Sequence, residues 1–105
     1  MTTFDKREEG FEQKFAQDEE LKFKADARRN KLLGLWAAEK LGLSGDAATA
    51  YAKQVVAADF DGADGAARKV TSDLAAKGVA VPETELRSTT TELMAVAIAQ
   101  VKAGK

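Results

Sequence analysis

The chain contains neither cysteine nor histidine among its 105 residues. These absences exclude thiol redox chemistry, zinc sites of the usual kind, and general base catalysis by imidazole near neutral pH. No apolar run reaches the roughly 18 residues of a membrane-spanning helix, and the N-terminus, MTTFDKREEG, lacks the apolar segment of a secretory signal. We therefore expect a soluble cytoplasmic protein that is not an enzyme, without catalytic residues, metal, cofactor or direct membrane insertion.

An excess of one charge sign is also missing, because 16 basic and 17 acidic side chains give a net charge of −1. This balance offers no overall attraction to nucleic acid or to anionic lipid. Eight basic and eight acidic side chains lie within residues 1–31, which is about half of all the charges in less than a third of the chain. The sequence therefore divides into a charge-dense N-terminal segment and a body richer in apolar residues.

The body predicts helices, since apolar residues recur at intervals of three and four and no segment alternates as a strand would. Gly42 and Gly78 are expected to end helices, and Pro82, the single proline, to begin the last one. We predict an all-α fold, a compact four-helix bundle over residues 19–105, with helices at about 19–41, 46–60, 64–77 and 83–102. The expected core comprises Leu32, Leu33, Trp36, Tyr51, Val55, Val70, Leu74, Leu86, Leu93, Ala97 and Val101.

Residues 16–31 do not follow the core pattern. Their only large apolar side chains are Leu21 and Phe23, which lie roughly 160° apart around a helix and so form no common seam. Oppositely charged residues at i, i+4 support a helix in water. We therefore interpret this segment as a solvated extension of the first helix, with core packing resuming at Leu32.

An aromatic stripe precedes this extension, formed by Phe4, Phe11 and Phe15 at i, i+7 and i+11. Such a stripe packs either on the body or in a groove of a partner. Residues 16–31 contain neither glycine nor proline to turn it back, which favours the partner, while Gly10 weakens a free helix. We predict that residues 1–18 form a mobile arm. One long helix folding over the bundle remains an alternative, because the stripe and Trp36 differ in phase by only about 40–50°.

The segments TTFDKREEGFEQKFA and DEELKFKADARRNKLLGLWAAEKLGL, within residues 2–43, closely resemble the alphaproteobacterial zeta subunit of the F-type ATP synthase, a small inhibitor protein. AYAKQVVAADF and RKVTSDL continue the resemblance, which covers essentially the whole chain. It implies a four-helix bundle whose mobile N-terminal arm inhibits ATP hydrolysis by ordering as a helix in a catalytic α/β interface and blocking hydrolytic rotation. The implied partner is the catalytic head of the synthase, with the central rotor as a further candidate contact. The location implied is cytoplasmic, peripheral to the inner membrane through the synthase.

The arm also looks like the F-x-K-R-E…E-x-[KR]-aromatic pattern of the mitochondrial ATPase inhibitor, from which Gly10 is a local departure. The two resemblances together imply a partner-binding set in the arm. Its members are Phe4, Asp5, Lys6, Arg7, Glu8, Phe11, Glu12, Lys14 and Phe15.

Other functions have weaker signals. DFDGADG, residues 59–65, lacks the glycine and glutamate spacing of a calcium loop, so a capped helix turn is the better interpretation. Arg28, Arg29 and Lys31 are flanked by acidic residues, as on a solvated face, and do not predict nucleic-acid binding. A nucleotide pocket has no phosphate-loop motif in support and is left open. The main alternative is a generic helical adaptor that binds another protein through the same N-terminal segment.

Overall fold

The structure, a computed structural model, describes residues 19–62 and 64–104. These residues form four α-helices and one 3-10 turn, without a strand: α2 Glu19–Lys40, α3 Gly45–Ala58, η1 Asp59–Asp61, α4 Gly65–Ala76 and α5 Glu83–Lys102. The prediction of an all-α fold with four helices is confirmed. The predicted arm, residues 1–18, lies outside the described residues.

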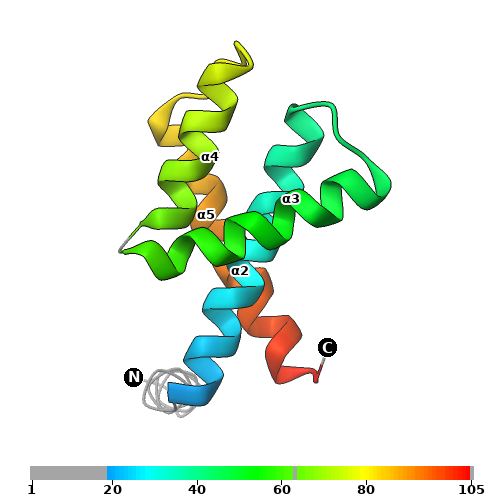
Figure 1. The fold of residues 1–105 in the computed structure, drawn as a ribbon. Coiled ribbons are helices and arrows are strands. Elements are labelled where there is room, and N and C mark those ends of the chain that lie inside the picture. The colour runs from blue at the N-terminus through cyan, green and yellow to red at the C-terminus, as the bar shows by residue number, and fades with distance from the viewer. Residues whose placement is uncertain (1–18, 63, 105) are drawn as a thin grey trace.

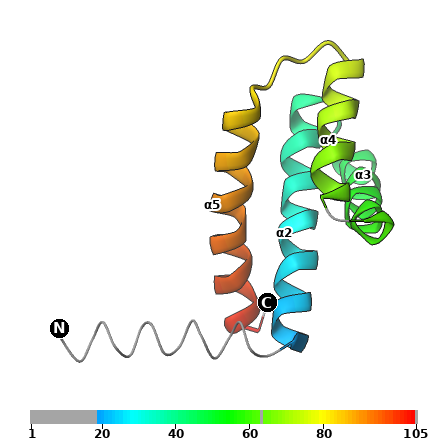
Figure 2. The same cartoon turned by 90° about the vertical axis from the view of Figure 1, so that its left-hand side faces the viewer.

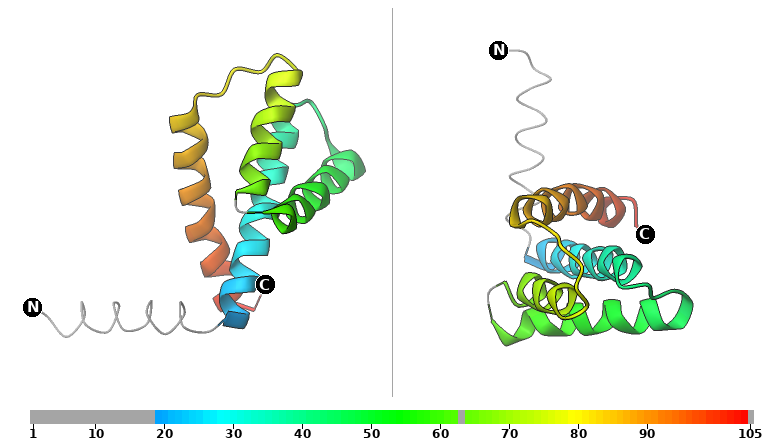
Figure 3. Two further views of the ribbon diagram at one scale, coloured as in Figure 1. Left: turned by 60° about the vertical axis from the view of Figure 1, so that its left-hand side comes forward. Right: turned by 90° about the horizontal axis from the view of Figure 1, so that it is seen from above.

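The helices are arranged around α2, which lies between two layers (Figure 3). On one side α5 runs antiparallel to α2, and the two helices lie side by side along much of their length (Figure 2). On the other side α4 runs beside α2, and α3 crosses α2 at a steep angle (Figure 1). Because α2 contacts each of the other three helices, it is the structural centre of the body.

Small residues allow α3 to cross so close to α2. A Cβ atom added at Gly34 would lie 2.6 Å from the Cα atom of Ala52 and 3.2 Å from the Cβ atom of Val55. Ala38 and Ala52 are also buried, with at most 1% of their surface exposed. A glycine inside a helix costs up to about 1 kcal/mol relative to alanine. Here the cost is offset by the backbone approach that only glycine permits.

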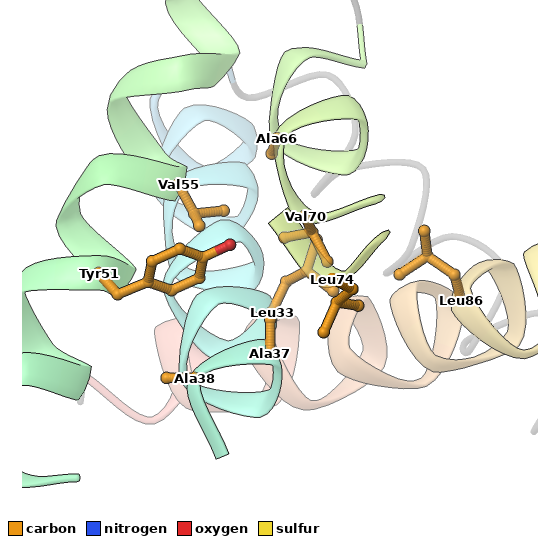
Figure 4. Close-up of a cluster of buried hydrophobic side chains, with 9 residues drawn as sticks. All are labelled: Leu33, Ala37, Ala38, Tyr51, Val55, Ala66, Val70, Leu74 and Leu86. Atoms are coloured by element: carbon orange, nitrogen blue, oxygen red, sulfur yellow. The ribbon is translucent and has the colours of Figure 1, made fainter. Parts of the chain in front are cut away.

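The hydrophobic core lies where α2, α3 and α4 meet, and α5 contributes to its edge (Figure 4). Seven of the predicted core residues are buried, namely Leu33, Tyr51, Val55, Val70, Leu74, Leu86 and Ala97. The other four, Leu32, Trp36, Leu93 and Val101, are half-buried. Alanines take central positions in their place: Ala37 and Ala38 have no exposed surface. The close spacing of the helices explains this, because it leaves room for methyl groups where larger side chains would not fit.

The expectation that residues 16–31 are a solvated extension holds for the exposed first turns of α2 but is wrong from Ala25 onward. Ala25 and Asn30 are each only 2% exposed, and this half of α2 lies beside the C-terminal half of α5 (Figure 2). Arg28 Nη1 donates a hydrogen bond to Gln100 Oε1 of α5, at 3.0 Å. The sequence pattern is misleading here because the contact uses small and polar residues, whereas helical periodicity reveals a contact made by large apolar ones.

Two helices end in the way their glycines predict. Gly42 and Gly78 have φ angles of 80° and 78°, which are strained for residues with a side chain. After each glycine the backbone N–H bonds back to the last turn: Leu43 N donates to Ala38 O at 2.8 Å, and Val79 N to Leu74 O at 2.9 Å. These are the bonds of a Schellman motif. Because Leu43 and Val79 also pack against the core, each helix end is fixed to the body.

A polar clasp joins α3 to α4 at the edge of the core. The hydroxyl of Tyr51 donates a hydrogen bond to Asp73 Oδ2 at 2.9 Å, and Lys69 Nζ lies 3.0 Å from the same oxygen. Burial raises the pKa of Tyr51 above its ordinary value, and the hydrogen bond to Asp73 and its negative charge add to this shift. Burial alone would raise the pKa of Asp73 as well, but the bonds from Lys69 and Tyr51 outweigh it and hold this pKa below its ordinary value.

Candidate partner-binding site

The partner-binding residues predicted from the sequence all lie within residues 4–15, outside the described part of the chain. The structure therefore does not place them. It does show where the arm joins the body: α2 begins at Glu19, at the end of the molecule where α5 ends (Figure 2). The described residues that follow the predicted site most closely in sequence therefore lie at this junction.

An exposed pair of aromatic rings lies at this junction. Phe23, in the first turns of α2, is 60% exposed, and Phe60, in η1, is 72% exposed. Their ring centroids are 6.4 Å apart and the ring planes are inclined by 39°, within the range of a favourable aromatic contact. Within residues 19–62 and 64–104, Val96 is the other large hydrophobic residue that is exposed, at 43%. Two of the three thus gather at one place.

A groove of about 570 Å³ adjoins Phe23 and is formed by α2, the C-terminal part of α3, and the end of α5. Its lining contains basic and apolar side chains and no carboxylate: Phe23, Lys24, Ala27, Arg28, Lys31, Val56, Val101 and Gly104. Lys24 Nζ lies 3.1 Å from Glu20 Oε1, an exposed i, i+4 pair of the kind expected from the sequence. We refer to Phe23, Phe60 and this groove together as the basal surface.

The sequence analysis did not identify the basal surface. On the sequence alone, Phe23 belongs to no apolar seam and Phe60 lies at the end of a predicted helix. The signal that could have been used is that both are large aromatic residues outside the predicted core stripes. Their proximity depends on how α3 crosses α2, which periodicity does not determine.

Two further hollows lie between α4 and α5, on the other part of the body. One, of about 510 Å³, is lined by apolar residues around the 77–82 connection, including Leu74, Val79 and Leu86. The other, of about 680 Å³, has hydroxyl groups and two arginines in its lining. One of these, Arg87, lies 2.8 Å from Glu83 Oε1 and is thereby paired. Neither hollow contains a charged group that is buried and aimed at a ligand.

The acidic turn at residues 59–64 acts as a helix connection. Asp64 has a left-handed backbone, with φ of 63°, and immediately precedes α4. Asp59 Oδ1 accepts a hydrogen bond from the backbone N–H of Ala66 at 3.4 Å. In the described ranges no three acidic, cysteine or histidine side chains lie close enough to hold a metal ion. Nor is any described helix both long and apolar enough to cross a membrane.

The described body exposes two adjoining aromatic rings beside a groove with basic side chains, and adjoining exposed apolar residues are typical of interaction surfaces. The chain matches the family described as ATPase inhibitor subunit zeta over residues 1–100, and it belongs to that family. It is a family of ATPase inhibitors.

A solved structure supports the fold. A protein whose structure was determined in solution by NMR is 53% identical to this chain, and the two structures superpose with a TM-score of 0.70. The match covers 81% of this chain and 99% of the other. A comparison with curated proteins gave no match.

Proposed function

We propose that this protein inhibits ATP hydrolysis by the F-type ATP synthase through residues 1–18, which order as a helix in a catalytic α/β interface and block hydrolytic rotation. The observation that carries the proposal is the range of the family match. It begins at residue 1 and reaches residue 100, so it includes the arm as well as the described body.

In this mechanism the phenylalanine stripe supplies most of the binding energy. Phe4, Phe11 and Phe15 share a helical face, and burial of one phenylalanine in a groove contributes roughly 1.5–3 kcal/mol. Part of this energy is spent on ordering the arm. The charged residues of the set determine register and partner more than affinity. They are Asp5, Lys6, Arg7, Glu8, Glu12 and Lys14.

The body performs the second part of the task, which is to hold the arm at the synthase. Residues 1–18 are joined at Glu19 to α2, the helix that contacts the other three. In this mechanism only residues 1–18 enter the interface, and the body stays outside it. Rotation in the direction of synthesis ejects the arm. The protein is therefore peripheral to the inner membrane only while it is bound to the synthase.

The proposal is tested by measuring ATP hydrolysis by the catalytic head of an alphaproteobacterial F-type ATP synthase. We expect the full chain to inhibit, and a version that starts at Ala16 not to inhibit, while its helical content and melting temperature change little. Equal potency of the two forms would contradict the role of the arm. If the full chain has no effect on hydrolysis, the generic helical adaptor becomes the better interpretation.

Single substitutions locate the contact within the arm. We expect Phe4→Ala and Phe11→Ala each to weaken inhibition by about tenfold or more, since a loss of about 1.4 kcal/mol corresponds to a factor of ten. Gln13→Ala is the matched control, because it lies in the same segment, between Phe11 and Phe15, but outside the proposed set. The melting temperature should stay near that of the wild type. If it falls sharply in either phenylalanine variant, the ring belongs to the core of the body.

A further inference from the structure

We infer that the basal surface is a second contact with the catalytic head of the synthase, formed by Phe23 and Phe60 at the mouth of the cleft that receives the arm. This inference rests on the proposed function and extends it from the arm to the body. The basal surface would fit an apolar depression edged by carboxylates on the synthase head.

The first observation is that the two rings are exposed together. Single exposed apolar residues are ordinary on protein surfaces, whereas adjoining ones mark interaction sites. Phe23 and Phe60 come from different elements and lie 6.4 Å apart, yet they are 60% and 72% exposed. The body has therefore placed them side by side without burying either, which gives them no large role in its own stability.

The second observation is the place of the pair on the chain. Phe23 follows Glu19, the first residue of α2, by one helical turn, or about 6 Å at 1.5 Å per residue. If residues 1–18 occupy a cleft as proposed, Phe23 lies within about one helical turn of the point where the chain leaves it. Phe60 lies there too, because it contacts Phe23.

The third observation is the charge around the rings. The groove that adjoins Phe23 includes Lys24, Arg28 and Lys31 in its lining but no acidic residue. A partner surface with carboxylates at its rim would match this lining, and basic groups at a rim chiefly direct orientation and association. Lys24 already lies 3.1 Å from Glu20 Oε1, and Arg28 already donates a hydrogen bond to Gln100 Oε1, so this charge favours a carboxylate-edged surface without specifying one.

The size of the pair indicates that its contact depends on the arm. A phenylalanine buries about 150–250 Å², so the exposed parts of two rings offer only a few hundred Å². Stable interfaces usually bury roughly 1,200–2,000 Å². The two rings alone cannot bury this much area, which argues against a dimer built on them. A small contact becomes effective when a linked segment is already bound, because the second association is then intramolecular.

The arm itself is a less suitable occupant of the basal surface. To reach Phe23, it would have to reverse direction within about residues 16–22, which contain neither glycine nor proline. Since α2 is already helical from Glu19, the reversal would have to fall in a still shorter stretch. Binding of the basal surface to the synthase head requires no such reversal of the chain.

The test compares full-length variants by inhibition of the synthase head and by recovery of hydrolysis after dilution, which reports release. We expect release of the double variant Phe23→Ala, Phe60→Ala to be about tenfold faster than that of the wild type, with inhibition at saturating concentration retained. Val96→Ala is the matched control, as it truncates the other large exposed hydrophobic side chain in the described body, and we expect no change in release. The melting temperatures of all variants should agree closely.

The outcomes separate this inference from the proposed function. If the wild type inhibits and the double variant is released at the same rate, the basal surface is not a contact and the role of the arm stands. If the double variant inhibits more strongly, the rings hold the arm back in the free protein, and the inference is overturned. If the wild type does not inhibit at all, the proposed function fails, and the inference fails with it.

A photoreactive p-benzoylphenylalanine in place of Phe60 identifies the occupant directly. We expect it to cross-link the bound protein to an α or β subunit of the synthase head. A cross-link to residues 1–18 of the same chain, or to a second copy of it, would overturn the inference.

Discussion

Substitution of Gly34 by alanine tests the packing of α3 on α2. Helix propensity alone predicts a gain, because alanine is favoured over glycine inside a helix by up to about 1 kcal/mol. The structure predicts a loss. The added methyl carbon would lie 2.6 Å from the Cα atom of Ala52, well inside the usual carbon contact distance of about 3.5–4 Å. Since the obstacle is backbone, it yields only if the two helices move apart.

The magnitude follows from the two opposing terms. Overpacking of a well-filled site typically costs about 1–3 kcal/mol, and the gain in propensity offsets at most about 1 kcal/mol of it. We expect Gly34→Ala to lower the free energy of unfolding by about 1–2 kcal/mol. At about 4–8 °C per kcal/mol for a domain of this size, the melting temperature should fall by roughly 5–15 °C.

Thermal unfolding followed by circular dichroism at 222 nm measures this change, and urea unfolding gives the free energy independently. A double-mutant cycle with Ala52→Gly adds a specific control, because it removes a methyl group that would lie 3.1 Å from the new one. The effects of the two substitutions should be coupled, so that Gly34→Ala costs less in the Ala52→Gly background. A melting temperature equal to or above that of the wild type would refute the close approach of α2 and α3.

Four further predictions concern the stability of the body. Gly65→Ala should lower the melting temperature by at least as much as Gly34→Ala, because its methyl group would overlap the carbonyl oxygen of Ala58. Tyr51→Phe should lower the free energy of unfolding by about 1 kcal/mol, measured by urea unfolding, through the lost hydrogen bond to Asp73. The stabilisation that comes from the depressed pKa of Asp73 is fully present above the unfolded-state value of about 3.9. It is lost as the pH falls below that value toward the folded-state pKa, so the melting temperatures of wild type and Asp73→Asn should converge there. Ala25→Leu should cost about 1–3 kcal/mol by overpacking, and a neutral result would restore the interpretation of this segment as solvated.

The helices could be predicted from the sequence because their ends carry local signals. Gly42 and Gly78 adopt positive φ angles that other residues avoid, and Pro82 immediately precedes α5. Such signals act within one turn of the chain and need no knowledge of the rest of the fold. The same holds for the central core positions of α4, Val70 and Leu74, which recur at i, i+4 and are both buried.

The contact between α2 and α5 could not be predicted in this way. Ala25 and Asn30 are buried there, but neither residue type distinguishes an interface from a surface. The half-burial of Leu32 and Trp36 has a related cause, since the close crossing at Gly34 brings α3 against alanines. Periodicity identifies the apolar face of a helix, whereas the depth of each residue depends on how near the neighbouring helix comes.

The candidate site divides in a similar manner. The partner-binding set in the arm was predicted from helical spacing and from a family resemblance, and membership of that family is confirmed. The residues of the set remain a prediction, because they lie outside the described ranges. The pairing of Phe23 with Phe60 became apparent only from the three-dimensional arrangement, as it joins two elements that are distant in sequence.

The central position of α2 determines how the body responds to a pull on the arm. A force on residues 1–18 enters the body at Glu19 and is transmitted along a helix that has α5 on one side and α3 on the other. A helix at the edge of the fold could be stripped away by breaking one interface. To strip away α2, both interfaces must break, so in the proposed complex residues 1–18 should slide out of the cleft before the body unfolds.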